Sequence, residues 1–451
     1  MTNKTQTGSN INTREIVLQI LSEVLEKGGY SHLIIKAALD KYAYLEKNDR
    51  AFIKRLSEGT IEQKIRLDYI IDSFSKTKTA KMKPLIREIL RMGTYQICFM
   101  EKIPDSAACN EAVKLAVKHG FSSLKGFVNG VLRSIARGKE QIDYPDPEKE
   151  TARFDSVYYS MPQWIVSRWL KAYGEKQTEQ ILQGLLQTRP VTIRRNTTQE
   201  EWNGLVEKWK ECGIQVHRSE LYADAYEVSG FDRIETMSGY QNGRFMIQDT
   251  GSMLITDFAR IRPGDRVIDV CAAPGGKALH AAFLTGENGQ VEARDLTEYK
   301  TSLIEENLAR SGFGNVAIKV WDATQEDADS IEKADVVIAD LPCSGLGAIA
   351  RKGDIKYRLK EEDIEQIASL QRTILSVVQT YVKPGGILLY STCTLTVEEN
   401  EANTEWFLQN FPFQLEEEQT LFPGNSHSGE TTDGFYMARL RKGPSGQPGA
   451  E

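Results

Sequence analysis

The stretch Arg266-Val-Ile-Asp-Val-Cys-Ala-Ala-Pro-Gly-Gly-Lys277 has the pattern of a buried strand, a tight turn and the start of a helix. Gly275 and Gly276 let a ligand approach the backbone closely, and the helix that follows offers free N–H groups. Further strand-like runs alternate with helical patterns, which predicts a doubly wound parallel sheet with helices on both faces. We expect strands at 266–270, 290–293, 316–320, 335–339 and 387–390, and helices at 277–284, 299–311 and 360–382.

Two familiar nucleotide-binding loops are excluded by the residues of this turn. A Walker A loop needs a glycine five residues before Gly276 and a Ser or Thr after Lys277, and those positions hold Cys271 and Ala278. A G-x-G-x-x-G fingerprint is excluded as well, because Ala272, Ala273 and Pro274 supply no leading glycines.

Two acidic residues indicate the ligand instead. Asp295 ends the second strand, where a carboxylate can accept hydrogen bonds from both ribose hydroxyls. Asp322 follows the third strand, where it can meet an adenine amino group. A ligand with ribose and adenine but no pyrophosphate is S-adenosylmethionine. The alternative is a turn whose glycines only pack, and the two acids in register argue against it.

The chain before this sheet divides into two further parts. Asn12 and Glu15 resemble a capping box ahead of apolar residues at helical spacing. Further helical patterns lie at 32–39, 47–64, 67–74, 84–100, 106–119 and 122–136. A Pro-rich break at 144–147 ends this bundle. A mixed α+β pattern follows it, with helices expected at 162–173, 175–186 and 199–212 and strands at 191–195, 214–217 and 225–228. The prediction is a multidomain protein with an all-α helical bundle (10–142), a small α+β unit (155–245), an α/β Rossmann-like domain (246–441) and a disordered tail (442–451).

Composition narrows the protein class further. The 451 residues include six cysteines without a C-x-x-C pair, which argues against a disulfide scaffold and against a zinc site, so no metal is expected. No apolar run reaches the ~18 residues of a membrane helix, and the polar N-terminus lacks a signal core. We therefore expect a cytoplasmic protein without a membrane partner.

The net charge of −7 conceals an asymmetry along the chain. Residues 1–140 carry 24 Lys and Arg against 15 Asp and Glu, a balance of +9, whereas residues 141–451 have a balance of −16. A basic module fused to an acidic one hints at a polyanionic partner for the basic part. Scatter between two globular domains explains the same numbers about equally well.

Two cysteines follow the ends of predicted strands. Cys343 lies in Asp340-Leu-Pro-Cys-Ser-Gly345 after the fourth strand, and Cys393 lies in Ser391-Thr-Cys-Thr394 after the fifth. A lone cysteine is usually a small buried hydrophobe, and Cys98, Cys109 and Cys212 suit that role. Two cysteines at the ligand-binding edge suggest chemistry instead.

Methylation of a pyrimidine at carbon 5 requires such a thiol. Carbon 5 is too weak a nucleophile to attack a sulfonium methyl group until a thiolate adds at carbon 6. A carboxylic acid at ring nitrogen 3 stabilises the charge that develops, and after methyl transfer a base removes the carbon 5 proton. These residues alone do not decide which cysteine attacks.

Four motifs together resemble the RNA 5-methylcytosine methyltransferases of the Nop/Sun class. They are Cys271–Lys277, Asp340–Gly345, Ser391–Cys393 and Thr432-Asp-Gly-Phe-Tyr436, and the helical N-terminus resembles the NusB antitermination fold. The resemblance extends over nearly the whole chain. It implies a NusB-like RNA-binding bundle and a Rossmann-like methyltransferase domain that uses S-adenosylmethionine.

The resemblance also implies residue roles. Cys393 would be the nucleophile, Cys343 would assist product release, and Asp340 would contact both the cytosine and the cofactor. The other cofactor contacts would be Cys271, Ala272, Ala273, Pro274, Gly275, Gly276, Lys277, Asp295 and Asp322. Two departures stand out: Leu341 replaces the family's usual alanine, and Arg351-Lys-Gly-Asp354 lacks its usual proline.

The expected substrate is a cytosine in 16S, small-subunit ribosomal RNA, either as free RNA or in an early assembly intermediate, with the enzyme acting as a monomer. Basic N-terminal helices would supply phosphate contacts, and the target base must be unpaired or flipped out. One alternative is a tRNA 5-methylcytosine methyltransferase. The other is a non-catalytic RNA-binding or assembly protein with a vestigial methyltransferase fold.

Overall fold

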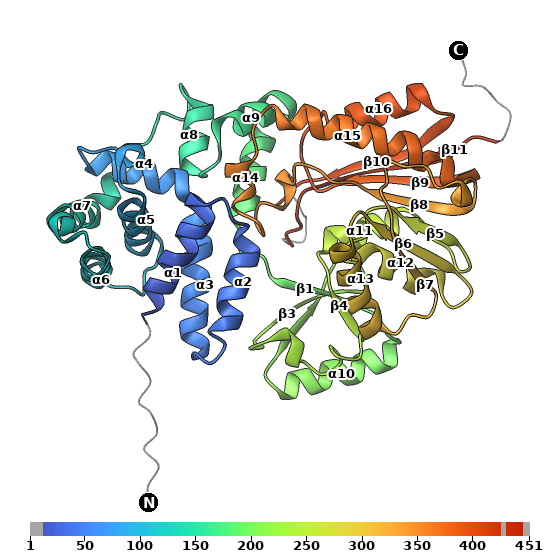
Figure 1. Ribbon diagram of the computed structural model, residues 1–451, viewed down its shortest axis with the longest axis horizontal. Coiled ribbons are helices and arrows are strands. Elements are labelled where there is room, and N and C mark those ends of the chain that lie inside the picture. Colours follow the sequence, from blue (N-terminus) through green and yellow to red (C-terminus); the bar gives the residue numbers. More distant parts are fainter. Residues whose placement is uncertain (1–11, 425–429, 445–451) are drawn as a thin grey trace, which may run out of the picture. The chain divides into compact units, whose positions relative to one another are not determined.

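The computed structural model describes residues 12–424 and 430–444 (Figure 1). Contacts within the chain divide it into two compact units. The first unit comprises residues 1–170 and 351–358, and the second comprises residues 171–350 and 359–451. The regions predicted as a small α+β part and a Rossmann-like part therefore belong to one unit, apart from residues 155–170 and 351–358, which belong to the helical unit.

The first unit is an all-helical bundle. Asn12 caps its first helix by accepting the N–H of Arg14 at 3.0 Å, which confirms the predicted helix start. Apolar side chains from seven of the helices, among them Leu18, Leu56 and Leu132, form one continuous core. The helices are α1 (Thr13–Leu21), α2 (Ser31–Lys41), α3 (Lys47–Glu62), α4 (Lys64–Phe74), α5 (Pro84–Phe99), α6 (Asp105–Lys118), α7 (Lys125–Gly138) and α8 (Thr151–Tyr158).

A short segment from much later in the sequence completes this bundle. Residues 351–358, which include α14 (Ile355–Arg358), belong to the helical unit by their contacts. Tyr357 packs against the bundle core. The sequence prediction placed this segment inside the Rossmann-like part, so the helical unit is discontinuous in a way that the prediction missed.

The second unit begins inside the long helix α9 (Gln163–Leu186). The two helices expected at 162–173 and 175–186 are joined there, and the break between them is Gly174 with φ 75°. Such a φ favours glycine, because a Cβ atom is strained in the left-handed region. The boundary between the two expected helices is therefore a real irregularity of the backbone.

A four-stranded antiparallel sheet forms the small α+β part of this unit. Its strand order is β2-β3-β1-β4, and α10 (Gln199–Glu211) packs on it through Trp202 and Trp209. The first three strands agree closely with the predicted strands, whereas β4 was not predicted. The strands are β1 (Val191–Arg195), β2 (Gln215–Arg218), β3 (Ala225–Ser229) and β4 (Phe245–Ile247).

A seven-stranded sheet forms the rest, in the order β10-β11-β9-β8-β5-β6-β7 (Figure 1). Five neighbouring strands of this sheet run parallel to one another, as predicted: β9, β8, β5, β6 and β7. Their carboxyl ends therefore meet at one edge of the sheet. These strands are β5 (Arg266–Asp269), β6 (Gln290–Asp295), β7 (Val316–Val320), β8 (Ala334–Asp340) and β9 (Val382–Thr392).

The prediction of a wholly parallel sheet was wrong for two strands. β10 (Phe413–Leu421) and β11 (Phe435–Lys442) run antiparallel and extend the sheet beyond β9. β11 also reaches Lys442, so the predicted tail begins inside a strand, and its residues 445–451 lie outside the described part of the chain.

Helices cover both faces of the seven-stranded sheet (Figure 1). On one face, α11 (Thr250–Phe258), α12 (Gly276–Thr285) and α13 (Glu298–Ser311) bury an aliphatic core that includes Ile255, Ala281 and Ile304. On the other face, α15 (Asp363–Val378) and α16 (Glu401–Asn410) bury Leu375 and Phe407. In the described ranges, no helix is both long and apolar enough to cross a membrane.

Candidate active site

Acidic and polar residues gather where the parallel strands end. Asp269 ends β5, Asp295 ends β6, Asp340 ends β8, and β9 ends with Ser391 and Thr392. Because β6, β5, β8 and β9 are neighbours in the sheet, these side chains lie at one edge. This is the edge at which ligands bind in doubly wound sheets.

The turn between β5 and α12 is tied to the end of β6. The N–H of Ala272 donates to Arg294 O at 2.8 Å, and the N–H of Ala273 donates to Asp295 Oδ2 at 3.0 Å. Gly275 has φ 104°, a conformation that only glycine adopts without strain. The turn is therefore an open backbone cradle, and the Asp295 carboxylate holds one side of it in place.

Asp295 and Asp322 are brought next to each other by the backbone. The N–H of Trp321 donates to Asp295 O at 2.9 Å, so Asp322 directly follows a residue paired with the end of β6. The Asp295 carboxylate also accepts the Lys300 ammonium at 2.9 Å, whereas Asp322 is exposed and accepts the N–H of Thr324 at 2.9 Å. The predicted ribose and adenine acids thus lie on adjacent strand ends.

Lys277 links the cofactor turn to the fourth strand. Its ammonium lies 2.7 Å from Asp340 Oδ2, and the Ser391 hydroxyl donates to Asp340 Oδ1 at 2.9 Å. The side chain of Lys277 is largely buried, and the adjacent carboxylates of Asp340 and Asp269 raise its pKa despite the opposing effect of burial. Lys277 is therefore a fixed positive charge at the centre of the site.

Asp269 is a site residue that the sequence analysis missed. It is 1% exposed, and its Oδ2 atom is buried without a hydrogen-bond partner. Burial, reinforced by the neighbouring carboxylate of Asp340, raises its pKa to about 7. An acidic residue inside an apolar strand, directly before the glycine turn, was the signal that could have identified it.

Replacing Asp269 with Asn should show whether its buried carboxylate destabilises the fold and whether it binds the cofactor. Between about pH 3.8 and 7, Asp269 is protonated in the folded protein but ionised in the unfolded chain. The native protein therefore loses stability as the pH rises through this window. We expect Asp269→Asn to be more stable than the native chain by roughly 1–3 kcal/mol at pH 8, with the difference shrinking toward pH 4. Thermal unfolding at several pH values measures this difference.

The same variant should bind S-adenosylmethionine about tenfold or more weakly, because the unpartnered Oδ2 is suited to accept an amino group of the ligand. Calorimetric titration measures the affinity. Unchanged affinity together with increased stability would show that Asp269 has no part in binding the cofactor.

The two cysteines of the sequence prediction are brought into contact. Their Sγ atoms lie 3.2 Å apart, and neither cysteine forms a disulfide. The backbone N–H of Cys393 donates to Cys343 Sγ at 3.3 Å, and the N–H of Gly347 donates to Cys393 O at 3.0 Å. The two loops that follow β8 and β9 are thus bonded to each other around the thiols.

The pKa of Cys343 is raised well above its usual value. The largest cause is its hydrogen bond with Cys393, followed by burial and by negative charge at Cys393 and Glu399. Cys343 therefore keeps its proton and shares it with the neighbouring sulfur. Cys393 in turn helps to raise the pKa of Lys277, so the lysine ammonium favours negative charge at Cys393.

Glu399 is a second residue that the sequence analysis missed. Its buried carboxylate accepts the backbone N–H of Ser344 at 2.9 Å, the Ser344 hydroxyl at 2.5 Å, the Thr396 hydroxyl at 2.7 Å and the Gln371 amide at 3.2 Å. Burial raises its pKa. This carboxylate fixes the residue that follows Cys343, and no spacing in the sequence connects Glu399 to that loop.

Cys271 lies in the cofactor turn but differs from the other two thiols. Burial and the carboxylates of Asp269, Asp295 and Asp340 raise its pKa, so it remains a neutral thiol. Its position fits a backbone contact with the ligand. In the described part of the chain, no cluster of His, Cys, Asp and Glu side chains is arranged to hold a metal ion.

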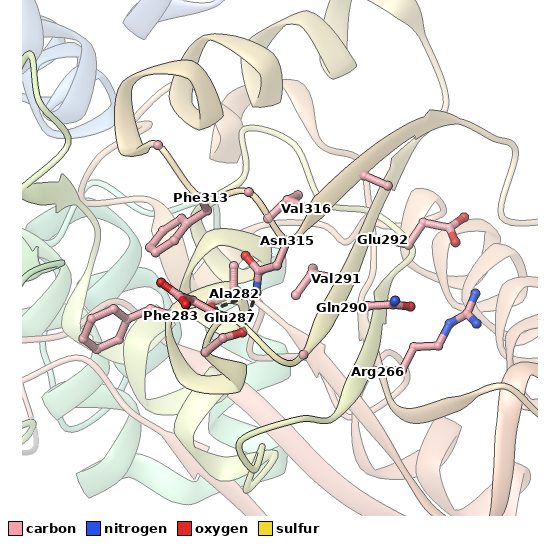
Figure 2. Close-up of a pocket in the computed structure, with 15 residues that line it drawn as sticks. Arg266, Ala282, Phe283, Glu287, Gln290, Val291, Glu292, Phe313, Asn315 and Val316 are labelled. Atoms are coloured by element: carbon pink, nitrogen blue, oxygen red, sulfur yellow. Dashed lines mark hydrogen bonds between the residues drawn. The ribbon is translucent and has the colours of Figure 1, made fainter.

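A pocket of about 910 Å³ lies at the opposite edge of the sheet (Figure 2). Its lining includes Arg266 and Gln290, the first residues of β5 and β6, and Phe313, which precedes β7. None of the residues predicted to bind the cofactor or the substrate lines it. The candidate site at the carboxyl edge is therefore separate from this pocket.

Known proteins of similar sequence show the family of this chain. A curated protein of Bacillus subtilis (strain 168), named probable ribosomal RNA small subunit methyltransferase B, is 36% identical over 403 residues and 88% of each chain. The chain belongs to the ribosomal RNA small subunit methyltransferase B family. Members from Synechocystis sp. and Klebsiella pneumoniae are 30% identical over 96% of this chain and 100% and 99% of their own.

Three family models match successive parts of this methyltransferase B family member. Residues 11–137 match the NusB family, residues 161–232 match a RsmF/B-like ferredoxin-like domain, and residues 258–441 match 16S rRNA methyltransferase RsmB/F. The expected fold, a NusB-like bundle, a small α+β unit and a Rossmann-like methyltransferase domain, is confirmed. The protein is thus a methyltransferase of the S-adenosylmethionine-dependent fold.

Solved structures share this architecture. PH0851 has a TM-score of 0.78 with 26% identity, and the match covers 97% of this chain and 100% of that one. A methyltransferase homolog protein from Pyrococcus horikoshii has a TM-score of 0.57 with 26% identity over 65% of this chain and 99% of its own.

Proposed function

We propose that this protein forms 5-methylcytosine in small-subunit ribosomal RNA through a covalent bond between Cys393 and the base. The observation that carries the proposal is the pair of thiols 3.2 Å apart, at the same sheet edge as the cofactor turn. The ion pair of Lys277 with Asp340 joins the two halves of this site.

The residues at this edge fit S-adenosylmethionine. The cradle of Cys271–Lys277, the acids Asp295 and Asp322 and the unpartnered oxygen of Asp269 match the amino acid, ribose and adenine parts of that ligand. When bound, the cofactor supplies an electrophilic methyl group. The chain itself must then make carbon 5 of the cytosine nucleophilic.

Cys393 is the thiol suited to attack. Cys343 keeps its proton, and its thiol, 3.2 Å from the Cys393 sulfur, can stabilise negative charge there by a hydrogen bond. The Cys393 thiolate forms a bond to carbon 6, and the electron pair of the C5–C6 double bond becomes shared between carbon 5 and ring nitrogen 3. Asp340, held by Lys277 and Ser391, is assigned to ring nitrogen 3, to which it relays a proton from the Lys277 ammonium, so that the negative charge developing there is neutralised. The proton returns when the product is released.

Cys343 is suited to release the product. When Cys393 becomes a thioether, it no longer places negative charge beside Cys343, so the Cys343 thiol can pass its proton to solvent. Its thiolate then accepts the carbon 5 proton of the methylated ring. The electron pair re-forms the C5–C6 double bond, the S–C6 bond breaks, and Cys393 leaves as a thiolate.

The substrate assignment rests on the relatives and on charge. Curated relatives carry names that specify small-subunit ribosomal RNA, and the N-terminal 140 residues have a balance of +9. A polyanionic RNA would gain salt-dependent contacts with the helical unit. The target cytosine must be unpaired or flipped out to reach the thiols, which fits free RNA or an early assembly intermediate better than a finished subunit.

Bisulfite sequencing tests the function. Purified enzyme, S-adenosylmethionine and unmethylated 16S RNA should yield a bisulfite-resistant cytosine, and a parallel reaction with bulk tRNA should yield none. Resistance in tRNA alone would overturn the ribosomal assignment and favour the tRNA alternative. No resistance in either RNA would contradict the proposed activity.

A further inference from the structure

The connection between β8 and α15 is unusually long. It runs from residue 341 to residue 362, whereas such connections commonly have about 2–6 residues. Its first part carries Cys343, and its middle part, residues 351–358, belongs to the helical unit. Only seven residues separate Cys343 from this middle part.

One attachment of the segment is at the carboxyl end of α3. Glu62 is the last residue of that helix, and its carbonyl oxygen accepts the Lys356 ammonium at 2.9 Å and the Tyr357 hydroxyl at 2.8 Å. Such a carbonyl has no partner within its own helix, and the helix dipole favours a cation there. Lys356 therefore replaces the partner that α3 lacks.

A second attachment is at the amino end of α2. Ser31, the first residue of that helix, donates its hydroxyl hydrogen bond to Asp354 Oδ1. The Arg358 guanidinium lies 3.3 Å from Asp354 and 3.7 Å from the centre of the Tyr30 ring. An acidic side chain at a helix start has the favourable sign, so each charge of the segment matches the helix end that it meets.

The burial of these charges makes the attachment specific. Asp354 is 2% exposed and Lys356 is 1% exposed, although charged side chains are rarely buried without partners. A shift of the segment by one residue would leave both charges without their helix ends. Asp354 and Lys356 thus hold the segment at two points.

We propose that the helical unit holds the loop that carries Cys343 in place through residues 351–358, and that Lys356 is a positioning residue for product release. This inference rests on the proposed function. The bundle would then act in the catalytic cycle as well as in RNA binding. Cys393 is on the loop after β9, which the sheet positions as well as its bonds to the Cys343 loop, so its attack on the base should depend on this attachment less than the role of Cys343 does.

The test is Lys356→Met in the full-length protein, followed in a single turnover with unmethylated 16S RNA. We expect methyl transfer to the RNA within threefold of the native rate. We expect the denaturant-stable protein–RNA adduct to disappear at least tenfold more slowly. Lys356→Arg should restore adduct decay, because a guanidinium keeps both the donor and the charge.

Lys139→Met is the matched control. Lys139 also belongs to the helical unit and donates to a backbone carbonyl near the end of α5, that of Ile97, at 3.0 Å, but it has no link to the loop. It should behave as the native protein in both measurements. Asp354→Asn removes the other attachment and should slow adduct decay as Lys356→Met does, which covers the case in which one variant fails to fold.

Equal losses in methyl transfer and adduct decay, or native behaviour of both loop variants, would overturn the inference. The proposed function fails separately, if Cys393→Ala still transfers methyl groups. Only the positioning role of Lys356 would be removed if Cys393→Ala were inactive while adduct decay stayed native in Lys356→Met and Asp354→Asn.

Discussion

Cys393→Ala should abolish methyl transfer, lowering the single-turnover rate by more than about 10³-fold, because the thiolate that adds to carbon 6 is lost. RNA binding and S-adenosylmethionine binding should remain, since the side chain is lost without disturbing the cofactor turn. Transfer of a radiolabelled methyl group to 16S RNA measures the rate, and filter binding measures the RNA affinity.

Cys212→Ala is the control for this variant, because Cys212 is an exposed thiol in the small α+β part and not the buried hydrophobe that the sequence predicted. It should be as active as the native enzyme. If Cys393→Ala kept full function, the non-catalytic RNA-binding alternative would be favoured over the enzyme.

Cys343→Ala should instead trap the covalent complex. Cys393 still attacks and the methyl group is still transferred, but no adjacent thiolate accepts the carbon 5 proton. We expect turnover to fall on the order of 10²–10⁴-fold, the usual contribution of a positioned base. The adduct should appear as a protein–RNA band that persists in denaturing gels.

The double variant Cys343→Ala/Cys393→Ala should form no such band, which shows that the trapped bond is to Cys393. The opposite pattern, with a stable adduct in Cys393→Ala and none in Cys343→Ala, would reverse the roles of the two thiols.

The regular parts of the fold were predictable because their patterns are local. Strand β7 and most helices of the bundle agree with the apolar periodicity to within a few residues. Strand β10 was not predictable in this way, because it is a sheet-edge strand with consecutive acidic residues. Glu416 and Glu417 of β10 form ion pairs with Arg439 of β11 at 2.8 and 3.0 Å. These contacts hold the strand where other strands use alternating apolar side chains.

The site was predictable where it follows a strand end and not where it depends on tertiary contacts. Cys343, Cys393 and Asp340 follow or end recognisable strands, and topology brings them together. Glu399 meets Ser344 across 55 positions of sequence. The attachment of Lys356 to Glu62 spans 294 positions, and no periodicity of the sequence reports a contact at that range.

The discontinuity of the helical unit also affects how the chain folds during synthesis. Its main part ends at Leu170, and its last eight residues follow only from Arg351 onward. At about 5–20 residues per second, a ribosome needs roughly 10–40 s to synthesise the intervening chain. During that interval the ends of α2 and α3 that Asp354 and Lys356 later cover are open to water or to a chaperone. The nascent bundle is therefore complete only when the chain beyond Cys343 has been translated.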